Sequence, residues 1–142
     1  MSLRVYDPTE ISVIFAGISL QGFADGEFVK IEQETDSFAD VVGTDGEVSR
    51  SKTSDKRATV TISLMQTSTS NDLLSAIATL DQIAPGGAGV GVLYIRDRLG
   101  RALFTSAEAW IAKVPDVSLD REPTKRDWKF RCAQLFRVDG GN

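Results

Sequence analysis

Two carboxylates at alternating positions are the most obvious candidates for catalysis in this sequence. Glu32 and Glu34 are separated by one residue, so in an extended strand both side chains would point to the same face. Paired carboxylates can act as acid and base, as they do in glycoside hydrolysis. The same spacing is equally expected on any strand face that meets water, and 20 acidic residues make chance pairs common. The pair alone therefore does not predict an enzyme.

The other groups that support catalysis or metal binding are sparse. The chain contains no histidine, which excludes a Ser-His-Asp triad and the usual zinc and blue-copper ligand sets. Cys132 is the only cysteine, so no internal disulfide can form, and no histidine is available to generate its thiolate. We expect Cys132 to be a small core residue, and we predict no catalytic residue, no metal site and no cofactor.

A glycine-rich stretch at residues 86–91 (GGAGVG) could suggest a phosphate-binding loop. Such loops follow a strand and precede the N-terminus of a helix, whose free N–H groups bind the anion. Here the order is reversed, because the glycines follow a predicted helix and precede a predicted strand. The stretch is therefore interpreted as a loop that ends the helix.

Length and composition predict one soluble globular domain spanning residues 1–142. The chain is 42% hydrophobic and 25% charged, near the averages for globular proteins. Its net charge of -4 argues against a nucleic-acid binder, which needs clustered lysine and arginine. No apolar run approaches the ~20 residues that cross a bilayer, and the first residues lack an export signal, so we expect no membrane anchor.

Short alternating segments punctuated by glycine and aspartate predict antiparallel β-structure with about seven strands and one helix. Turn residues Asp25-Gly26 predict a hairpin, and we expect 37–42 to pair with 27–34. A second hairpin is expected through Arg98-Leu99-Gly100. The predicted strands are residues 11–16 with a second run at 18–20, 27–34, 37–42, 58–65, 90–97, 101–105 continued by 107–114, and 127–138. In the last of these, Trp128, Phe130, Cys132 and Phe136 should share one face, and Lys129, Arg131 and Arg137 the other.

A helix is predicted where the apolar spacing changes period after residue 70. Leu73, Leu74 and Ile77 recur at helical spacing and should dock the helix, and Ser70 is the expected N-cap. One helix cannot cover a sheet of this size, so the strands must close on themselves. We predict a mainly β fold, an antiparallel β-barrel or sandwich with one α-helix docked outside.

The segment 43–57 is unusual, because Val48 is its only sizeable apolar side chain. Loops longer than ~12–15 residues are uncommon in compact domains and are usually functional or disordered. The segment is either a flexible surface loop or an arm that becomes ordered against a neighbouring subunit. The candidate contact residues are Asp45, Glu47, Val48, Arg50, Lys52, Asp55, Lys56 and Arg57.

Several blocks of the sequence resemble phage tail tube proteins. Residues 46–51 (GEVSRS), 57–68 (RATVTISLMQTS) and 70–74 (SNDLL) are similar to the central block of that family. There, a polar loop, an alternating strand and the single helix follow one another. Residues 23–28 (FADGEF), 109–116 (AWIAKVPD) and 126–132 (RDWKFRC) resemble further parts of the family. The resemblance spans residues 12–138 and points to the tail tube of a contractile-tailed, myovirus-like phage.

The resemblance implies a function in assembly. Tail tube proteins form hexameric rings whose sheets join into an inner barrel, and the rings stack into a tube for genome DNA. The fold is shared with the haemolysin-coregulated ring proteins of secretion systems. The implied partners are further copies, a tail sheath protein outside, and baseplate and tail terminator proteins at the ends. Tape-measure protein and DNA would pass through the lumen, in a virion assembled in the host cytoplasm.

Within this interpretation the 43–57 segment would reach the adjacent ring. The candidate lumen-facing residues are Lys30, Glu32 and Glu34, with Thr59, Thr61 and Ser63 as a second candidate surface. An acidic wall would repel DNA and so let it pass. A ring-forming secretion-system protein is the main alternative. A monomeric small-ligand barrel or hydrolase is a weaker one, because the sequence offers no nucleophile motif.

Overall fold

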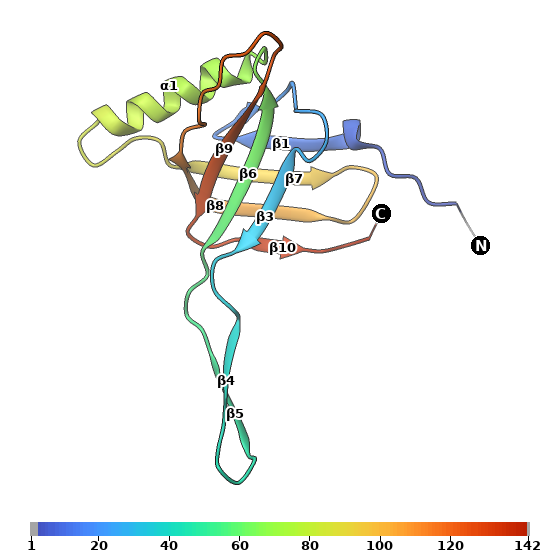
Figure 1. Cartoon of the computed structure of the whole chain (residues 1–142), viewed down its shortest axis with the longest axis vertical. Coiled ribbons are helices and arrows are strands. Elements are labelled where there is room, and N and C mark those ends of the chain that lie inside the picture. The colour runs from blue at the N-terminus through green and yellow to red at the C-terminus, as the bar shows by residue number, and fades with distance from the viewer. Residues whose placement is uncertain (1–2, 142) are drawn as a thin grey trace.

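The computed structural model describes residues 3–141, which contain ten strands, one α-helix and one 3-10 helix (Figure 1). The 3-10 helix η1 spans Pro8–Glu10 and the α-helix α1 spans Ser70–Ile83. The strands are β1 Ile11–Phe15, β2 Ile18–Ser19, β3 Val29–Gln33, β4 Phe38–Val42, β5 Val48–Lys52, β6 Ala58–Met65, β7 Gly91–Asp97, β8 Leu103–Lys113, β9 Lys125–Cys132 and β10 Phe136–Val138.

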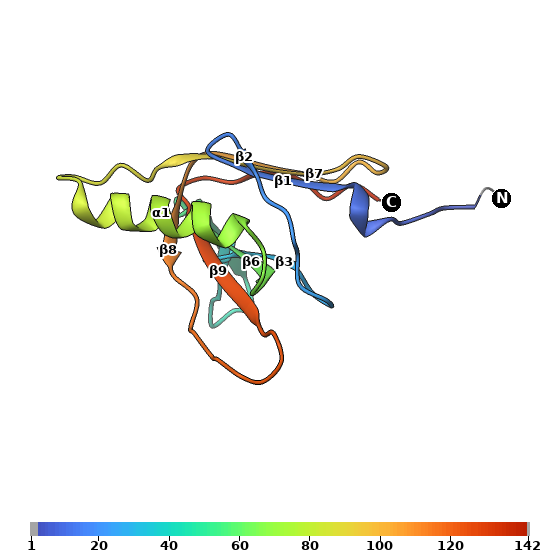
Figure 2. The ribbon, with the colours of Figure 1, turned by 90° about the horizontal axis from the view of Figure 1, so that it is seen from above.

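Eight of these strands form one antiparallel sheet in the order β2-β1-β7-β8-β9-β6-β3, with β10 also paired to β8. The long strand β8 belongs to two layers. Its first half pairs with β7 and β10 and forms the first layer with these strands, β1 and β2. Its second half pairs with β9 from Ala109 to Lys113, with an irregularity between Ile111 and Lys113, and forms the second layer with β9, β6 and β3. The strands of the two layers run across one another (Figures 1 and 2). The predicted fold is thus confirmed as a sandwich, an open one, because β2 and β3 end the sheet without pairing to each other in the described residues.

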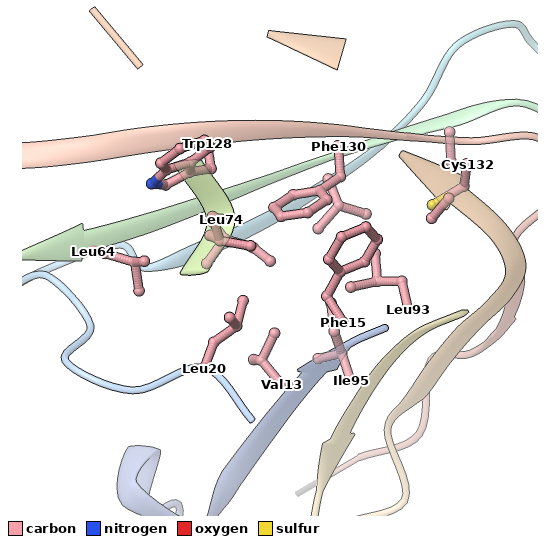
Figure 3. Close-up of a cluster of buried hydrophobic side chains, with 14 residues drawn as sticks. Val13, Phe15, Leu20, Leu64, Leu74, Leu93, Ile95, Trp128, Phe130 and Cys132 are labelled. Carbon is pink, nitrogen blue, oxygen red and sulfur yellow. The ribbon is translucent and has the colours of Figure 1, made fainter. Parts of the chain in front are cut away.

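The core lies between the two layers and is supplied by the inward side chains of alternating strand positions. Val60, Ile62 and Leu64 of β6 are fully buried, as the alternation of that strand predicts. Phe15 of the first layer meets Phe130 of the second edge to face, with ring centroids 4.8 Å apart (Figure 3). Such pairs add about 0.5–1.5 kcal/mol beyond the area they bury. These contacts fix one layer against the other.

The helix α1 covers one side of the sandwich but docks through fewer residues than predicted. Leu74 is fully buried and Ile77 packs against the core, whereas Leu73 is 46% exposed. Neighbouring helix positions differ by about 100° in direction, so Leu73 and Leu74 cannot face the same surface. Ser70 is the first helical residue rather than the N-cap, and its hydroxyl accepts a hydrogen bond from the backbone N–H of Gln21. No helix within residues 3–141 is long and apolar enough to span a membrane.

Three strand predictions are wrong. Gly26 adopts a left-handed turn (φ 88°), but β2 and β3 on either side of it lie in different layers and do not pair. Strand β4 pairs with β5 and not with β3. The last predicted strand is broken after Cys132, so Phe136 lies on β10 and is 61% exposed. In the first and third cases a non-local pairing determines the outcome, β3 with β6 and β10 with β8, whereas β4 is taken up by a local hairpin with β5. The hairpin through residues 98–100, by contrast, is confirmed by the pairing of β7 with β8.

Candidate assembly surfaces

The outer face of the second layer brings together the two groups of residues proposed for the lumen. Lys30 lies opposite Thr61, and Glu32 lies opposite Thr59, in the antiparallel pairing of β3 with β6. Inward and outward side chains alternate along both strands, so these four residues share one face of the sheet. The sequence had offered them as two alternative surfaces, and the register makes them a single one.

Strand β9 adds basic residues to the same face. Arg131 lies opposite Thr59, Lys129 opposite Thr61 and Asp127 opposite Ser63. Lys125 continues this row opposite Met65, and Lys113 of β8 lies opposite Lys129. With Lys30, Glu32 and Glu34 the face therefore carries five basic and three acidic side chains. It mixes both signs with an excess of bases, which differs from the acidic wall expected from the net charge of the chain.

Local contacts hold several of these charges in place. Lys30 forms an ion pair with Glu32 at 3.2 Å (Nζ to Oε1). Glu34 lies just past the end of β3, accepts a hydrogen bond from the Thr59 hydroxyl and is 3.9 Å from Arg131 (Nη2 to Oε1). Ser63 is only 6% exposed and donates to Asp127 at 2.6 Å, so it contributes little open surface to this face.

The segment 43–57 is not a loop along its length. It comprises a tight turn at 43–47, the strand β5 and a return leg at 53–57, and β5 pairs in register with β4 to form a two-stranded hairpin. Gly46 adopts φ 86°, a conformation that glycine takes without strain, and the Asp45 carboxylate accepts from the backbone N–H of Glu47. The hairpin projects from one end of the long axis of the molecule (Figure 1).

The hairpin leaves its side chains exposed on both faces. Val41, Val42 and Val48 are 62–70% exposed near the tip, and Arg50 stacks on Phe38 with its guanidinium carbon 4.1 Å from the ring centroid. An isolated two-stranded hairpin is at best marginally stable in water. The exposed valines of β4 were missed at the sequence level, because a strand assigned to the main sheet was expected to bury them.

A joint centred on Asp55 connects the hairpin to the body. Its carboxylate accepts hydrogen bonds from the Thr35 hydroxyl at 2.6 Å and from the backbone and guanidinium N–H groups of Arg57 at 3.0–3.1 Å. The guanidinium of Arg57, followed by Thr35, holds the pKa of the Asp55 carboxyl well below its usual range. The joint lies where the ladder of β3 with β6 has ended and that of β4 with β5 has not begun. Asp55 therefore links the two legs of the hairpin.

The groups considered for catalysis are occupied in structural contacts. Burial raises the pKa of the Cys132 thiol, which disfavours the reactive thiolate. In the glycine-rich loop, the backbone N–H groups of Ala88 and Gly89 both donate to the carboxylate of Asp81 at 2.9 Å. The chain's own acid therefore takes the place that a phosphate would need. Among residues 3–141 no cluster of three or more Cys, Asp or Glu side chains is placed to hold a metal ion.

Comparisons with known proteins identify relatives among phage structural proteins. A family model described as Bacteriophage PhiTE tail tube protein matches residues 11–140. "Structural protein ORF10" of Pseudomonas phage KPP10 is 33% identical over 143 residues, which cover 96% of this chain and 83% of that protein.

Two solved structures share the fold at low sequence identity. The tube terminating cap of the anti-feeding prophage aligns with a TM-score of 0.64 and 9% identity, covering 97% of this chain and 94% of that one. The sheath/tube terminator of the extracellular contractile injection system PVC aligns with a TM-score of 0.64 and 7% identity, covering 97% and 99%. These two likenesses concern the fold alone. The family match and the phage relative together show that the chain belongs to the Bacteriophage PhiTE tail tube protein family, a family of structural phage proteins.

Proposed function

We propose that this chain forms hexameric rings that stack into the tube of a contractile phage tail, through which genome DNA passes. The observation that carries the proposal is the pair of open edges of the second layer. This layer has the strand order β8-β9-β6-β3, and β3 has no partner beyond β6 among the described residues. At the other side, residues 110–113 of β8 extend past the start of β7 and pair only with β9.

The two edges suit a head-to-tail ring. Four antiparallel strands alternate in direction, so β3 and β8 run oppositely, and copies related by rotation would bring β3 of one beside β8 of the next in antiparallel orientation. A heterologous contact of this kind closes into a ring when the rotation closes. Each open edge is a liability in a monomer and is covered in a ring.

In such a ring the polar face would line the lumen. Lys30, Glu32, Glu34, Thr59 and Thr61 would contribute to the wall, with Ser63 largely covered by its contact with Asp127. DNA binds tightly where a protein supplies clustered cations that displace its counterions. Three of the five bases on this face are held in ion pairs, Lys30 with Glu32, Arg131 with Glu34 and Lys113 with Asp116, and this neutralisation favours passage over tight binding.

The remaining surfaces would serve the rest of the tail. The hairpin, with its contact residues among 43–57, would reach the adjacent ring. The exposed face of α1 would meet a surrounding sheath, and terminator and baseplate proteins would bind the two ends. Tape-measure protein and DNA would occupy the lumen without specific binding. The chain would be a virion component assembled in the host cytoplasm.

The open edge of β3 provides the test. The backbone N–H of Glu34 and the carbonyl of Phe28 bond to β6, so the alternate N–H groups of Val29, Ile31 and Gln33 point to the open side. Proline at position 29 removes one such donor and leaves the bonds to β6 intact. We expect Val29→Pro to remain folded by circular dichroism and to be monomeric by native mass spectrometry.

The matched control is Val29→Ala, which loses side-chain volume but keeps the N–H, and which should form hexamers as the unaltered chain does. Hexamers of Val29→Pro equal in yield to those of Val29→Ala would contradict the proposed ring contact. Persistent single rings that never stack, in the unaltered chain, would favour a secretion-type ring protein instead.

A further inference from the structure

The tip of the hairpin presents an apolar knob with two acids beside it. Val42 and Val48 lie opposite each other in the last pair of the ladder and are 62% and 63% exposed. The turn that follows contains Asp45 and Glu47, and neither forms an ion pair within residues 3–141. Side chains of this kind at the end of a projecting arm are expected to be covered by a partner.

A groove that combines apolar side chains with an arginine, and could therefore receive the apolar and acidic tip, lies at the opposite end of the long axis (Figure 1). The helix α1 begins there beside the connection from β8 to β9, while the hairpin leaves from the other end (Figure 1). The groove has a volume of about 390 Å³ and is lined by Gln66, Asn71, Asp72, Ser75, Val114, Pro115, Val117, Arg126 and Trp128. Trp128 is held there by a hydrogen bond from its indole N–H to Asn71 at 2.9 Å.

The charges in the groove complement those of the hairpin. Arg126 donates to Thr124 and to the Lys125 carbonyl, and no carboxylate within residues 3–141 forms an ion pair with it. Asp72 supplies one acid on the helix side. The hairpin carries its acids at the tip and the base Arg50 two positions after Val48, on the same face.

We propose that the hairpin tip of one copy docks in this groove of a second copy in the adjacent ring. Val42 and Val48 would pack against Val114, Val117 and Pro115, and the acids of the tip would approach Arg126. A knob at one end and its acceptor at the other make an open, head-to-tail contact, which repeats without limit along an axis and so builds a tube. This inference rests on the proposed function, because it requires that rings of this chain stack.

An engineered disulfide tests which surface receives the tip. The doubly substituted chain Val48→Cys with Val117→Cys should form disulfide-linked chains under oxidising conditions once tubes have assembled. Val48→Cys with Leu119→Cys is the matched control, because Leu119 lies on the same connection and is 79% exposed but does not line the groove. The native Cys132 is fully buried and should remain unlinked.

A third pair, Val48→Cys with Val92→Cys, probes the rival apolar surface on the flank of the first layer, where Val92, Ala107 and Phe136 lie together. Linkage through position 117, with only background linkage through 119 and 92, is the expected result. Assembled tubes that link through 92 or 119 as well as through 117, or not at all through 117, would overturn the assignment.

A charge placed in the groove gives a second readout. Val117→Asp should abolish stacking while leaving single rings, whereas Leu119→Asp should leave tubes intact, and both positions are exposed enough that the fold should be kept. Tubes of unchanged length from Val117→Asp would overturn the docking site alone. Absence of rings and tubes from the unaltered chain would overturn the proposed function, and the docking site with it.

Discussion

Two pairs of antiparallel strands in this molecule have similar backbones and opposite surroundings. In the pair of β6 with β9, the inward residues Val60, Ile62 and Phe130 are fully buried, and the outward residues form a polar face. In the pair of β4 with β5, every residue is exposed. The pairing of β6 with β9 is stabilised by the apolar side chains that it buries. The pair of β4 with β5 is held by its turn, by cross-strand contacts and by the joint at Asp55.

The difference in burial indicates that the body determines the stability of the fold and that the hairpin is available for contacts with other molecules. Burying apolar area is the main favourable term in folding, so the body should be stable without the hairpin. The hairpin buries almost nothing within the chain, and its exposed valines can gain burial only from another molecule. Changes to the body should therefore alter stability, and changes to the hairpin should alter assembly.

The largest effect is expected from opening the core. Phe130→Ala removes a fully buried ring that packs on Phe15 and should lower the free energy of unfolding by about 3–5 kcal/mol. Val48→Ala in the hairpin should change it by no more than about 0.5 kcal/mol. Chemical denaturation of both variants measures the contrast, and equal losses would contradict a division between body and hairpin.

Removing the hairpin should separate stability from stacking. Ser37 and Thr53 are joined by a backbone hydrogen bond of 2.9 Å, so an Asn-Gly turn can replace Phe38–Lys52 between them. The shortened chain should melt near the temperature of the full chain and form rings but no tubes, as seen by electron microscopy. Tubes of normal length from the shortened chain would show that the hairpin is not the stacking element.

Two glycines with left-handed backbones allow a finer comparison. A Cβ at Gly22 of the body would lie 2.7 Å from the Cβ of Ser68, whereas one at Gly46 of the hairpin would have nothing within 4 Å. Alanine at position 46 should cost only the backbone strain of about 1–2 kcal/mol. Gly22→Ala should lower the unfolding free energy further, because a clash adds to the same strain. A smaller loss at 22 than at 46 in denaturation experiments would contradict this packing.

The smallest effect concerns the joint at Asp55. Hydrogen bonds lower the pKa of its carboxyl in the folded chain, so the carboxylate stabilises the fold above pH ~4 and loses that contribution as the pH falls through the folded value. Asp55→Asn should therefore have a slightly lower melting temperature, with a constant difference between pH 5 and 8 that shrinks below pH 4. Thr35→Val removes the second of the hydrogen bonds that lower this pKa, so it should show the same pH dependence in weaker form. If the difference in melting temperature between Asp55→Asn and the unaltered chain grew as the pH fell below 4, the stabilising role of the Asp55 carboxylate would be refuted.

The sequence predicted the parts of the fold that depend on local pattern. The alternation of β6 identified a buried strand, and the change of period after residue 70 identified the helix. Leu73 was wrongly predicted to be buried, because the spacing of apolar residues does not define how wide the buried face of a helix is. The strand β5 was missed because VSRSK has no buried face and therefore lacks the alternation that marks strands of the core.

The candidate surfaces depended on non-local pairing, which a single sequence does not encode in a readable way. Lys30 and Thr61 are brought together only by the register of β3 with β6, and the basic residues of β9 join them through a second register. The mixture of acids and bases on that face was therefore not evident from the net charge of the chain. The groove over Trp128 combines the helix with the connection from β8 to β9, and no local motif marks it.

Negative-stain electron microscopy of the purified chain at high concentration is the most direct test of ring and tube formation. We expect hexameric rings that stack into tubes, with single rings remaining when the hairpin is removed. A monodisperse monomer that forms no rings at any salt concentration would contradict this expectation.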